Sequence, residues 1–417
     1  MNPADPRRPV AMLAHSYYEE DPRVRREAEA LVARGREVDV FALRRPEDPR
    51  DGVLKGVRIH RLDVQRHQGS GIGTYLREYV SFLVRAGLAV TRAHRRRRYA
   101  VLHVHTLPDF LVFAGLPLRI RGVPLVLDLH EAMPEFFRTR FPRASNPVVH
   151  RIMLLEERAS IRLATAVLTV NDALRDRLVS LGVRPAKVSV ILNSPALDIF
   201  DPATQPTRRF AEDGVVRLVY AGALSATYEL DVAITAVAFL RELRPDLAVN
   251  LEIYGRDFGE GALAAHAAAV GVADRVAFND RIPLEDVPAA LACADIGLAP
   301  TRRDPYTDFS LSTKIFEYGA MGKPVVASRL PMVERVFPPG SVTTYTPGDP
   351  TELARAILRL VDDPAGREAA VAATSKRVHE LAWVHDADKL SALIDRLAGD
   401  ATVHAEGASG TSDAIAP

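Results

Sequence analysis

Strand-like and helix-like segments alternate along the chain, and this alternation limits the fold more than any other feature of the sequence. The expected strands are 10–14, 37–43, 101–105, 124–129 and 166–170, followed by 215–220, 250–254, 276–279 and 296–299. The expected helices are 21–34, 108–121, 147–163 and 172–181, followed by 229–243, 261–270, 284–292 and 386–397. Short apolar runs that alternate with amphipathic helices predict an α/β fold with doubly wound parallel sheets.

A polar, proline-bearing stretch at 200–214 interrupts the alternation, which then begins again. We therefore predict an N-terminal Rossmann-like domain at 1–205 and a C-terminal one at 214–380. A helix at 381–398 is expected to return toward the N-terminal domain, and the small, polar residues 399–417 to be a disordered tail. Two such sheets would face a central cleft, since ligands bind at the carboxyl ends of their strands.

Composition excludes several classes of protein. The 417 residues carry a formal net charge of +1, so no global charge indicates nucleic-acid binding. Cys293 is the only cysteine, which excludes an internal disulfide, and its apolar surroundings predict a buried thiol. No signal peptide or membrane-spanning segment is apparent, and we expect a cytoplasmic protein.

Residues 309–326, FSLSTKIFEYGAMGKPVV, combine a polar loop, a short helix and a buried strand. Ser312 or Thr313 can cap a helix whose first turn carries Lys314, so backbone N–H groups and a cation converge there. Glu317 projects from the same helix face and could accept hydrogen bonds from a ribose diol. This pattern predicts a site for a phosphorylated ligand. The alternative is an ordinary helix–strand unit in which Lys314 and Glu317 form a solvated pair.

Several motifs in order along the chain resemble the retaining GT-B-fold glycosyltransferases of family 4. The match is most specific at 310–328, and supporting matches lie at 21–28, 103–109, 128–131, 191–193 and 220–224. The resemblance covers roughly residues 11–397. It implies a nucleotide-diphosphate sugar as donor substrate on the C-terminal domain, an acceptor that approaches from the N-terminal domain, and no further cofactor.

By this resemblance, Glu317 matches the second glutamate of the family signature, which holds the nucleotide ribose. Phe309 stands where the first glutamate would lie, and its side chain cannot accept a hydrogen bond from the donor sugar. Backbone N–H groups of Ser310 and Leu311, before Ser312, could hold the sugar or phosphate instead.

The turn at Gly222 also departs from the family pattern, because the arginine and lysine that many relatives place just after it are absent. Lys314 must then carry more of the diphosphate charge as a catalytic residue, with Arg302 or Arg303 from the preceding loop as further candidates. The alternative for these two loop arginines is simple solvation.

Histidines mark the ends of two N-terminal strands. The resemblance implies that His130 contacts the donor near the reacting centre, although a structural histidine is an alternative. Glu131 is a weaker candidate for activating the acceptor, and His105 could border the acceptor side. His103 and His105 share one strand face, but without a third ligand nearby we predict no metal site.

The sequence therefore predicts a metal-independent enzyme that transfers a sugar to an acceptor hydroxyl with retention of configuration. An epimerase or phosphorylase of the same fold, or a non-catalytic sugar-nucleotide-binding protein, remains an alternative. The acceptor is unknown and could be lipid-linked. Residues 75–90 are amphipathic and lead into Arg92–Arg98, so they could contact an anionic membrane; a solvated helix end is the alternative.

Overall fold

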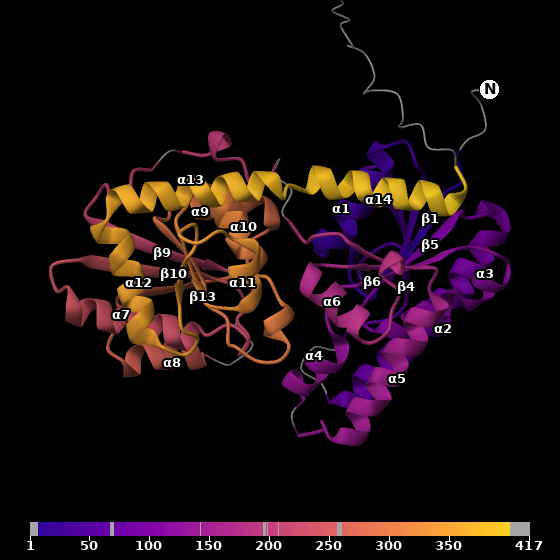
Figure 1. The fold of residues 1–417 in the computed structure, drawn as a ribbon, viewed down its shortest axis with the longest axis horizontal. Helices are drawn as coiled ribbons and strands as arrows, with labels where there is room; N and C mark the ends of the chain where they lie inside the picture. Colours follow the sequence, from indigo (N-terminus) through magenta and orange to yellow (C-terminus); the bar gives the residue numbers. More distant parts are fainter. Residues whose placement is uncertain are drawn as a thin grey trace, which may run out of the picture. The chain divides into compact units, whose positions relative to one another are not determined.

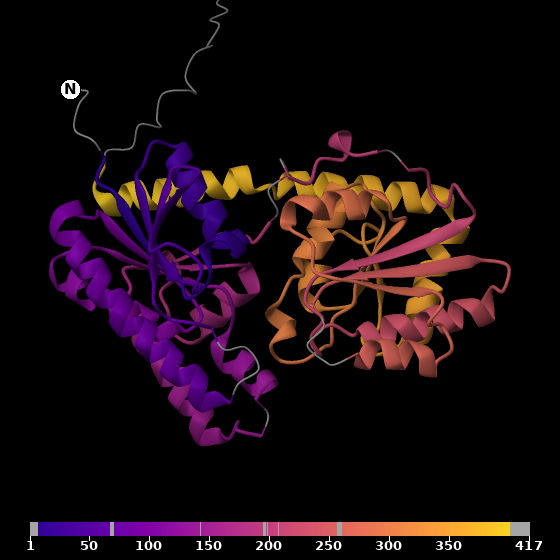
Figure 2. The ribbon, with the colours of Figure 1, turned by 180° about the vertical axis from the view of Figure 1, so that it is seen from behind.

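The computed structural model describes residues 7–66, 71–141, 143–194, 197, 199–206, 208–256 and 261–400. The chain divides into two compact units, each built around its own sheet (Figures 1 and 2). The first unit contains the described residues of Met1–Pro134, Ser145–Ile191 and Val384–Pro417. The second contains those of Glu135–Ala144 and Leu192–Trp383. The predicted α/β class with two doubly wound sheets is confirmed.

The first unit has an eight-stranded sheet in the order β3-β4-β2-β1-β5-β6-β7-β8, parallel except for the β3–β4 hairpin. Its strands are β1 (Val10–Leu13), β2 (Val38–Leu43), β3 (Asp51–Leu54), β4 (Val57–Leu62), β5 (Val101–His105), β6 (Leu125–Leu129), β7 (Ala166–Thr169) and β8 (Val188–Val190). Its helices are α1 (Pro22–Ala33), α2 (Ile72–Arg97), α3 (Leu116–Ile120), α5 (Pro147–Leu163), α6 (Asp172–Ser180) and most of α14 (Trp383–Ala398).

The second unit has a six-stranded parallel sheet in the order β11-β10-β9-β12-β13-β14. Its strands are β9 (Val215–Ala221), β10 (Ala248–Tyr254), β11 (Val276–Asn279), β12 (Ile296–Ala299), β13 (Val325–Ser328) and β14 (Thr343–Tyr345). Its helices are α7 (Leu230–Leu243), α8 (Ala262–Ala269), α9 (Val287–Ala292), α10 (Thr313–Ala320), α11 (Pro331–Val336), α12 (Pro350–Asp362) and α13 (Pro364–Glu380). Helix α4 (Met133–Arg140) lies mostly in this unit too.

Two local predictions differ from the structure. The helix expected at 108–121 is instead a 3-10 helix at Asp109–Gly115 followed by α3, whose first turn contains Pro117. Proline has no backbone N–H to continue a preceding helix, so a new helix starts there. The β3–β4 hairpin was not predicted; its turn places Lys55 and Gly56 at positive φ, as tight hairpins require.

The boundary between the units falls at Ile191, earlier than the predicted end of the N-terminal domain at 205. The reason is burial: Phe200 packs in the second unit's core with Ile315 and Phe316. Residues from Val384 onward belong to the first unit, where Asp395 of α14 pairs with Arg36. The expected disordered tail lies, from residue 401, outside the described residues.

The prediction of a buried thiol at Cys293 is wrong, because Cys293 is exposed. It follows the last residue of α9 as the C-cap, where the helix ends and its side chain turns toward solvent.

Candidate functional site

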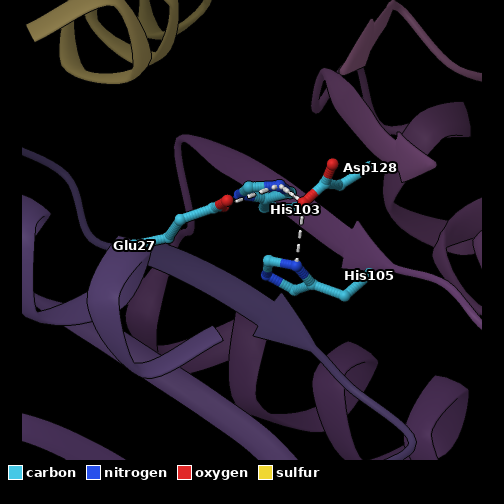
Figure 3. A group of neighbouring side chains, drawn as sticks. All are labelled: Glu27, His103, His105 and Asp128. Atoms are coloured by element: carbon cyan, nitrogen blue, oxygen red, sulfur yellow. Dashed lines mark hydrogen bonds and ion pairs between the residues drawn. The ribbon is translucent and has the colours of Figure 1, made fainter. Parts of the chain in front are cut away.

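Charged side chains from α1 and two strands meet inside the first unit (Figure 3). Asp21 caps α1 by accepting a hydrogen bond from the Val24 backbone, and Pro22 occupies the first helical position. One turn apart on this helix, Arg23 and Glu27 are both buried. His103 and His105 alternate along β5, so their side chains share one face of the strand, and the buried Asp128 follows on β6. We call these five residues the buried ionic cluster.

The strongest contact in this cluster joins Arg23 to Asp128. Nε and Nη2 of Arg23 donate to Oδ2 and Oδ1 of Asp128 at 2.9 and 2.8 Å, a two-point contact between planar groups. Nε of Arg23 also lies 3.2 Å from Oε1 of Glu27, and Nη1 donates to the Ile191 carbonyl at 3.1 Å. The guanidinium therefore ties α1 to β6 and to Ile191, which directly follows β8.

Two histidines complete the set of donors around Asp128. Oδ2 of Asp128 lies 3.2 Å from Nδ1 of His105 and 3.0 Å from Nε2 of His130. Because both ring nitrogens face the same carboxylate oxygen, each is best placed to donate a hydrogen bond to it. The 3.4 Å distance between Nδ1 of His105 and Nε2 of His130 then separates two donors. In neutral His130 the proton consequently sits on Nε2, and Nδ1 carries the lone pair.

Burial and charge act in opposite directions on these groups. Burial would raise the pKa of Asp128, but Arg23, His130 and the hydrogen bonds from two histidines hold it well below its ordinary value. Burial raises the pKa of Glu27 despite the nearby Arg23. Burial lowers the pKa of His103 well below its ordinary value, and the neighbouring His105 acts in the same direction. Burial also disfavours charge on His105, yet its hydrogen bond to Asp128 and the charge of Glu27 raise its pKa overall.

The cluster contains a set of possible metal ligands, so the premise that no third ligand lies near the two histidines is wrong. Ligand atoms of Glu27, His103, His105 and Asp128 all lie within 4.8 Å of one another. A divalent ion does not fit this set, because the Arg23 guanidinium already contacts both carboxylates. An ion bound there would have to displace or oppose a buried cation. That the protein works without metal stays a prediction.

The histidine at the edge of the cluster is His130, whose side chain is 19% exposed, whereas that of His105 is 1% exposed. The backbone N–H of His130 donates to Oγ1 of Thr106 at 3.1 Å, which fixes the residue at the end of β6. His105 is buried against Asp128, and its expected place at the acceptor side stays a prediction. Glu131, directly after His130, is half-buried.

The second unit holds the other predicted residues, centred on Lys314. This lysine lies in the first turn of α10 and is buried. Its Nζ lies 4.2 Å from the centre of the Tyr228 ring and 5.0 Å from that of Tyr220. Two aromatic faces thus hold the ammonium in place, which rules out the alternative of a solvated surface lysine.

Gly222 directly follows β9, and its missing side chain leaves the space that the Lys314 side chain occupies. A Cβ at Gly222 would lie 2.5 Å from Cε and 2.7 Å from Nζ of Lys314, distances that real Cβ atoms do not show. The backbone N–H of Gly222 donates to the Tyr254 carbonyl at 2.9 Å. Only a glycine lets the ammonium lie against the backbone at this carboxyl end of the sheet, where parallel sheets bind ligands.

Glu317 is half-buried one turn after Lys314. Burial raises its pKa, although the charge of Lys314 and a hydrogen bond from Thr313 act against the shift. Ser312 is the N-cap of α10, but its side chain makes no capping hydrogen bond. The first turn of α10 therefore keeps backbone N–H groups that a ligand oxygen could accept from.

The Ser310 backbone N–H, which was expected to hold the sugar or phosphate, is engaged within its own loop. It donates to the Thr307 carbonyl at 3.0 Å, which closes a 3-10 turn, and the Ser310 hydroxyl donates to the Tyr306 carbonyl at 3.2 Å. Both donors of Ser310 are thus engaged within the loop. Leu311 packs partly against the core of the second unit.

The two loop arginines differ in their surroundings. Arg303 is exposed and its Nε donates to Asp308 at 3.1 Å. Arg302 is also exposed; its backbone N–H donates to the Thr227 carbonyl, and its Nε lies 4.0 Å from the buried Glu229. Arg302 thus contacts the 222–229 loop, which also carries Gly222 and Tyr228 beside Lys314, whereas Arg303 pairs within its own loop.

Sequence reasoning missed Arg23 and Asp128 as site residues, and it also missed Tyr220 and Tyr228. A charged residue inside the apolar strand 124–129 was the available signal for Asp128. Arg23 lay in a quoted motif, but nothing local to that helix shows which carboxylate it pairs with. Tyr220 also lay in a quoted motif, whereas Tyr228 carried no such signal.

Known proteins resemble the chain over most of its length. Residues 21–194 match the model of the Glycosyl transferase 4-like domain, and residues 216–363 match that of Glycosyl transferases group 1. The chain is 27% identical over 401 residues to the alpha-D-kanosaminyltransferase of Streptomyces kanamyceticus, covering 90% of this chain and 97% of that protein. It is 26% identical over 392 residues to the D-inositol 3-phosphate glycosyltransferase of Thermomonospora curvata, covering 87% of each.

Among solved structures, that of Anabaena HepE in complex with UDP and glucose matches with a TM-score of 0.68 at 17% identity. The match covers 93% of this chain and 99% of HepE. The order of the two sheets and the two family matches agree with one another. The chain therefore belongs to the group-1-type glycosyltransferases of family 4 and has their GT-B fold.

Proposed function

We propose that this glycosyltransferase takes its sugar from a nucleotide-diphosphate donor held by the second unit, and transfers it to a hydroxyl acceptor with retention and without metal. The acceptor oxygen attacks the anomeric carbon, the bond from that carbon to the phosphate oxygen breaks, and the departing phosphate accepts the acceptor's proton. The chain's own groups bind the donor, orient it and stabilise the charge that develops on the phosphate.

The observation that carries this proposal is the position of Lys314. Its ammonium is buried between Tyr220 and Tyr228, lies against Gly222, and sits in the first turn of α10. A fixed cation beside uncapped helix N–H groups suits a diphosphate, because neither has to reorganise as negative charge builds up. In this proposal Glu317 accepts hydrogen bonds from the ribose, and Arg302 approaches the phosphates from its loop.

The relatives support a nucleotide sugar. HepE binds UDP and glucose in its solved complex, and the two most informative relatives are a kanosaminyltransferase and an inositol phosphate glycosyltransferase. Phe309 replaces a glutamate of the family signature, so we expect a donor sugar with fewer hydrogen bonds to this loop than in typical relatives.

In the first unit, His130 is the group we assign to the reacting centre. Asp128 holds its Nε2, which leaves Nδ1 to bond a sugar hydroxyl or a phosphate oxygen. Asp128 and Arg23 act as positioning residues, because they are buried and reach substrate only through His130.

A donor screen followed by calorimetry tests the site. A panel of nucleotide sugars is first ranked by thermal shift of the wild-type protein. Lys314→Met and Glu317→Gln should each weaken binding of the best donor at least tenfold, since each removes a hydrogen bond involving a charged group. Lys376→Met, which alters an exposed lysine of α13, serves as the matched control. Donor affinity at the wild-type level in both site variants would remove the second unit's site from the proposal.

The reaction itself is tested with the donor so identified and a panel of acceptors. Retention requires the anomeric configuration of the donor in the first-formed product, as observed by proton NMR. Turnover should persist in excess chelator. Donor conversion without any acceptor would favour an epimerase, and donor binding without turnover across the panel would favour a non-catalytic protein.

A further inference from the structure

Exposed aliphatic side chains gather on three helices of the first unit. Of the thirteen large hydrophobic side chains that are exposed in the described part of the chain, nine lie on α2, α3 and α5. On α2 they are Leu76, Val80, Val84 and Leu88, on α3 Leu116 and Ile120, and on α5 Val148, Ile152 and Leu155. Single exposed apolar residues are normal on any surface, but a concentration of this kind marks an interaction site.

The spacing of these residues makes them continuous stripes. Leu76, Val80, Val84 and Leu88 follow one another at intervals of four, so they run along one side of α2 for about 18 Å. The opposite side of α2 carries Phe82, Ala86 and Val90, which are buried in the core of the first unit. The stripe therefore faces away from the sheet, and no described core residue covers it.

The three helices cover the same face of the first sheet. Helix α2 connects β4 to β5, α3 connects β5 to β6, and α5 connects β6 to β7, so all three connections run in the same direction along the sheet. The connection from β1 to β2, which contains α1, runs in the opposite direction. Right-handed crossovers then put α2, α3 and α5 on one face and α1 on the other. Figures 1 and 2 show α2, α3 and α5 on the side of this sheet away from α1 and α14. Both α2 and α5 pack against the 3-10 helix Asp109–Gly115 between them.

Arginines flank the apolar stripes. Nine arginines of the three helices are exposed: Arg77, Arg85, Arg92, Arg95 and Arg96 on α2, Arg119 on α3, and Arg151, Arg158 and Arg162 on α5. Within the described residues none of these guanidinium groups forms an ion pair or a side-chain hydrogen bond. No acidic side chain of these three helices is exposed. Since the whole chain carries a net charge of only +1, this positive charge is local.

Several other arginines of the first unit are paired on their own unit. Arg36, Arg45, Arg58 and Arg61 each pair with one or more carboxylates on the same unit. The nine exposed arginines of α2, α3 and α5 are thus left for a partner that supplies the anions.

We infer that the outer face of α2, α3 and α5 docks onto an anionic lipid membrane. The aliphatic stripes enter the boundary between headgroups and acyl chains, and the flanking arginines bind lipid phosphates. Nucleic acid would satisfy the arginines but not the nine aliphatic side chains, and a purely apolar partner would leave the arginines unpaired. No described helix is long and apolar enough to cross the bilayer, so the contact is peripheral. The surface extends well beyond the basic segment 92–98 expected from the sequence.

Vesicle flotation with the full-length protein tests this inference. Vesicles of phosphatidylcholine with about one third phosphatidylglycerol should bind the protein, and pure phosphatidylcholine should bind it far less. About 0.5 M salt should weaken binding, because the Debye length falls to a few ångströms. Neither donor nor acceptor is needed, so failure here would leave the proposed transfer reaction untouched.

Two sets of variants identify the surface. Replacing Arg92, Arg95 and Arg96 together by Gln should lower the partition coefficient about a hundredfold, at a factor of about five for each arginine. The triple Leu76→Ser, Val80→Ser and Val84→Ser should abolish insertion, and its effect should persist in high salt. Matched controls on the second unit, Arg355→Gln and Leu243→Ser, also alter exposed side chains and should bind as wild type.

Three outcomes would overturn the inference. The wild type could fail to float with anionic vesicles, or both triple variants could float as the wild type does. Alternatively, sedimentation could show a wild-type dimer that the serine triple converts to a monomer, with no vesicle binding, in which case the stripes cover a second copy of this chain.

Discussion

Removal of the Arg23 guanidinium should destabilise the first unit strongly. The side chains of Arg23 and Asp128 are only 4% and 0% exposed, and two hydrogen bonds of 2.8 and 2.9 Å join them. Arg23→Met leaves Asp128 with two histidines as its remaining donors and Glu27 without its nearest cation. Breaking a buried pair in this way costs about 3–5 kcal/mol, a large part of the ~5–15 kcal/mol that stabilises a typical domain.

Urea unfolding followed by circular dichroism measures this loss, and hydrogen exchange of the β5 and β6 amides assigns it to the first unit. The matched control is Arg34→Met at the end of α1, because the partner of Arg34, Asp388, is 71% exposed. That pair should contribute less than about 1 kcal/mol. The double variant Arg23→Met/Asp128→Leu should lose less stability than Arg23→Met alone, since it leaves no unpaired aspartate.

The reasoning is refuted if Arg23→Met costs no more than Arg34→Met. It is also refuted if the costs of Arg23→Met and Asp128→Leu simply add in the double variant, because side chains in direct contact must show coupling.

Three further predictions concern the site. Gly222→Ala should weaken donor binding, measured by calorimetry, about tenfold or more, since the new Cβ would force the Lys314 ammonium away. Gly73→Ala is the control and should have no effect, because its Cβ would meet nothing within 4 Å. Equal donor affinities in the two variants would contradict the geometry. His130→Ala should lower turnover about a hundredfold while changing donor affinity far less, and unchanged turnover would exclude His130 from the reaction. Stability measured against pH should separate the two buried histidines. Because the folded-state pKa of His103 is lowered, its contribution raises stability as pH rises toward 6.5, and His103→Gln should remove that slope. The folded-state pKa of His105 is raised, so its contribution to stability is full below pH 6.5 and is lost as pH rises through the folded pKa. His105→Gln should therefore change the slope in the opposite sense to His103→Gln. Identical slopes in the two variants would contradict both assignments.

The sequence determined the fold class and much of the second unit's site. Hydrophobic runs, caps and glycines act over a few residues, so the strands, most helices and the Lys314–Glu317 segment could be predicted locally. The family motifs fixed the order of the two domains. Local signals failed where a proline divided an expected helix, and where Phe200 joined the second core despite its polar neighbours.

Only the tertiary structure decided which distant side chains meet. Arg23 and Asp128 are 105 residues apart in sequence, and they pair because the fold brings the first turn of α1 to the end of β6 and buries both charges together. In the same way Gly222 makes room for Lys314 across the second sheet. Secondary structure follows from short-range periodicity, whereas the pairing of buried charges and the gathering of free arginines on one face follow from how the crossovers stack. The sequence alone therefore predicted a donor segment, and the packing of the first unit added the buried ionic cluster and the surface proposed to bind lipid.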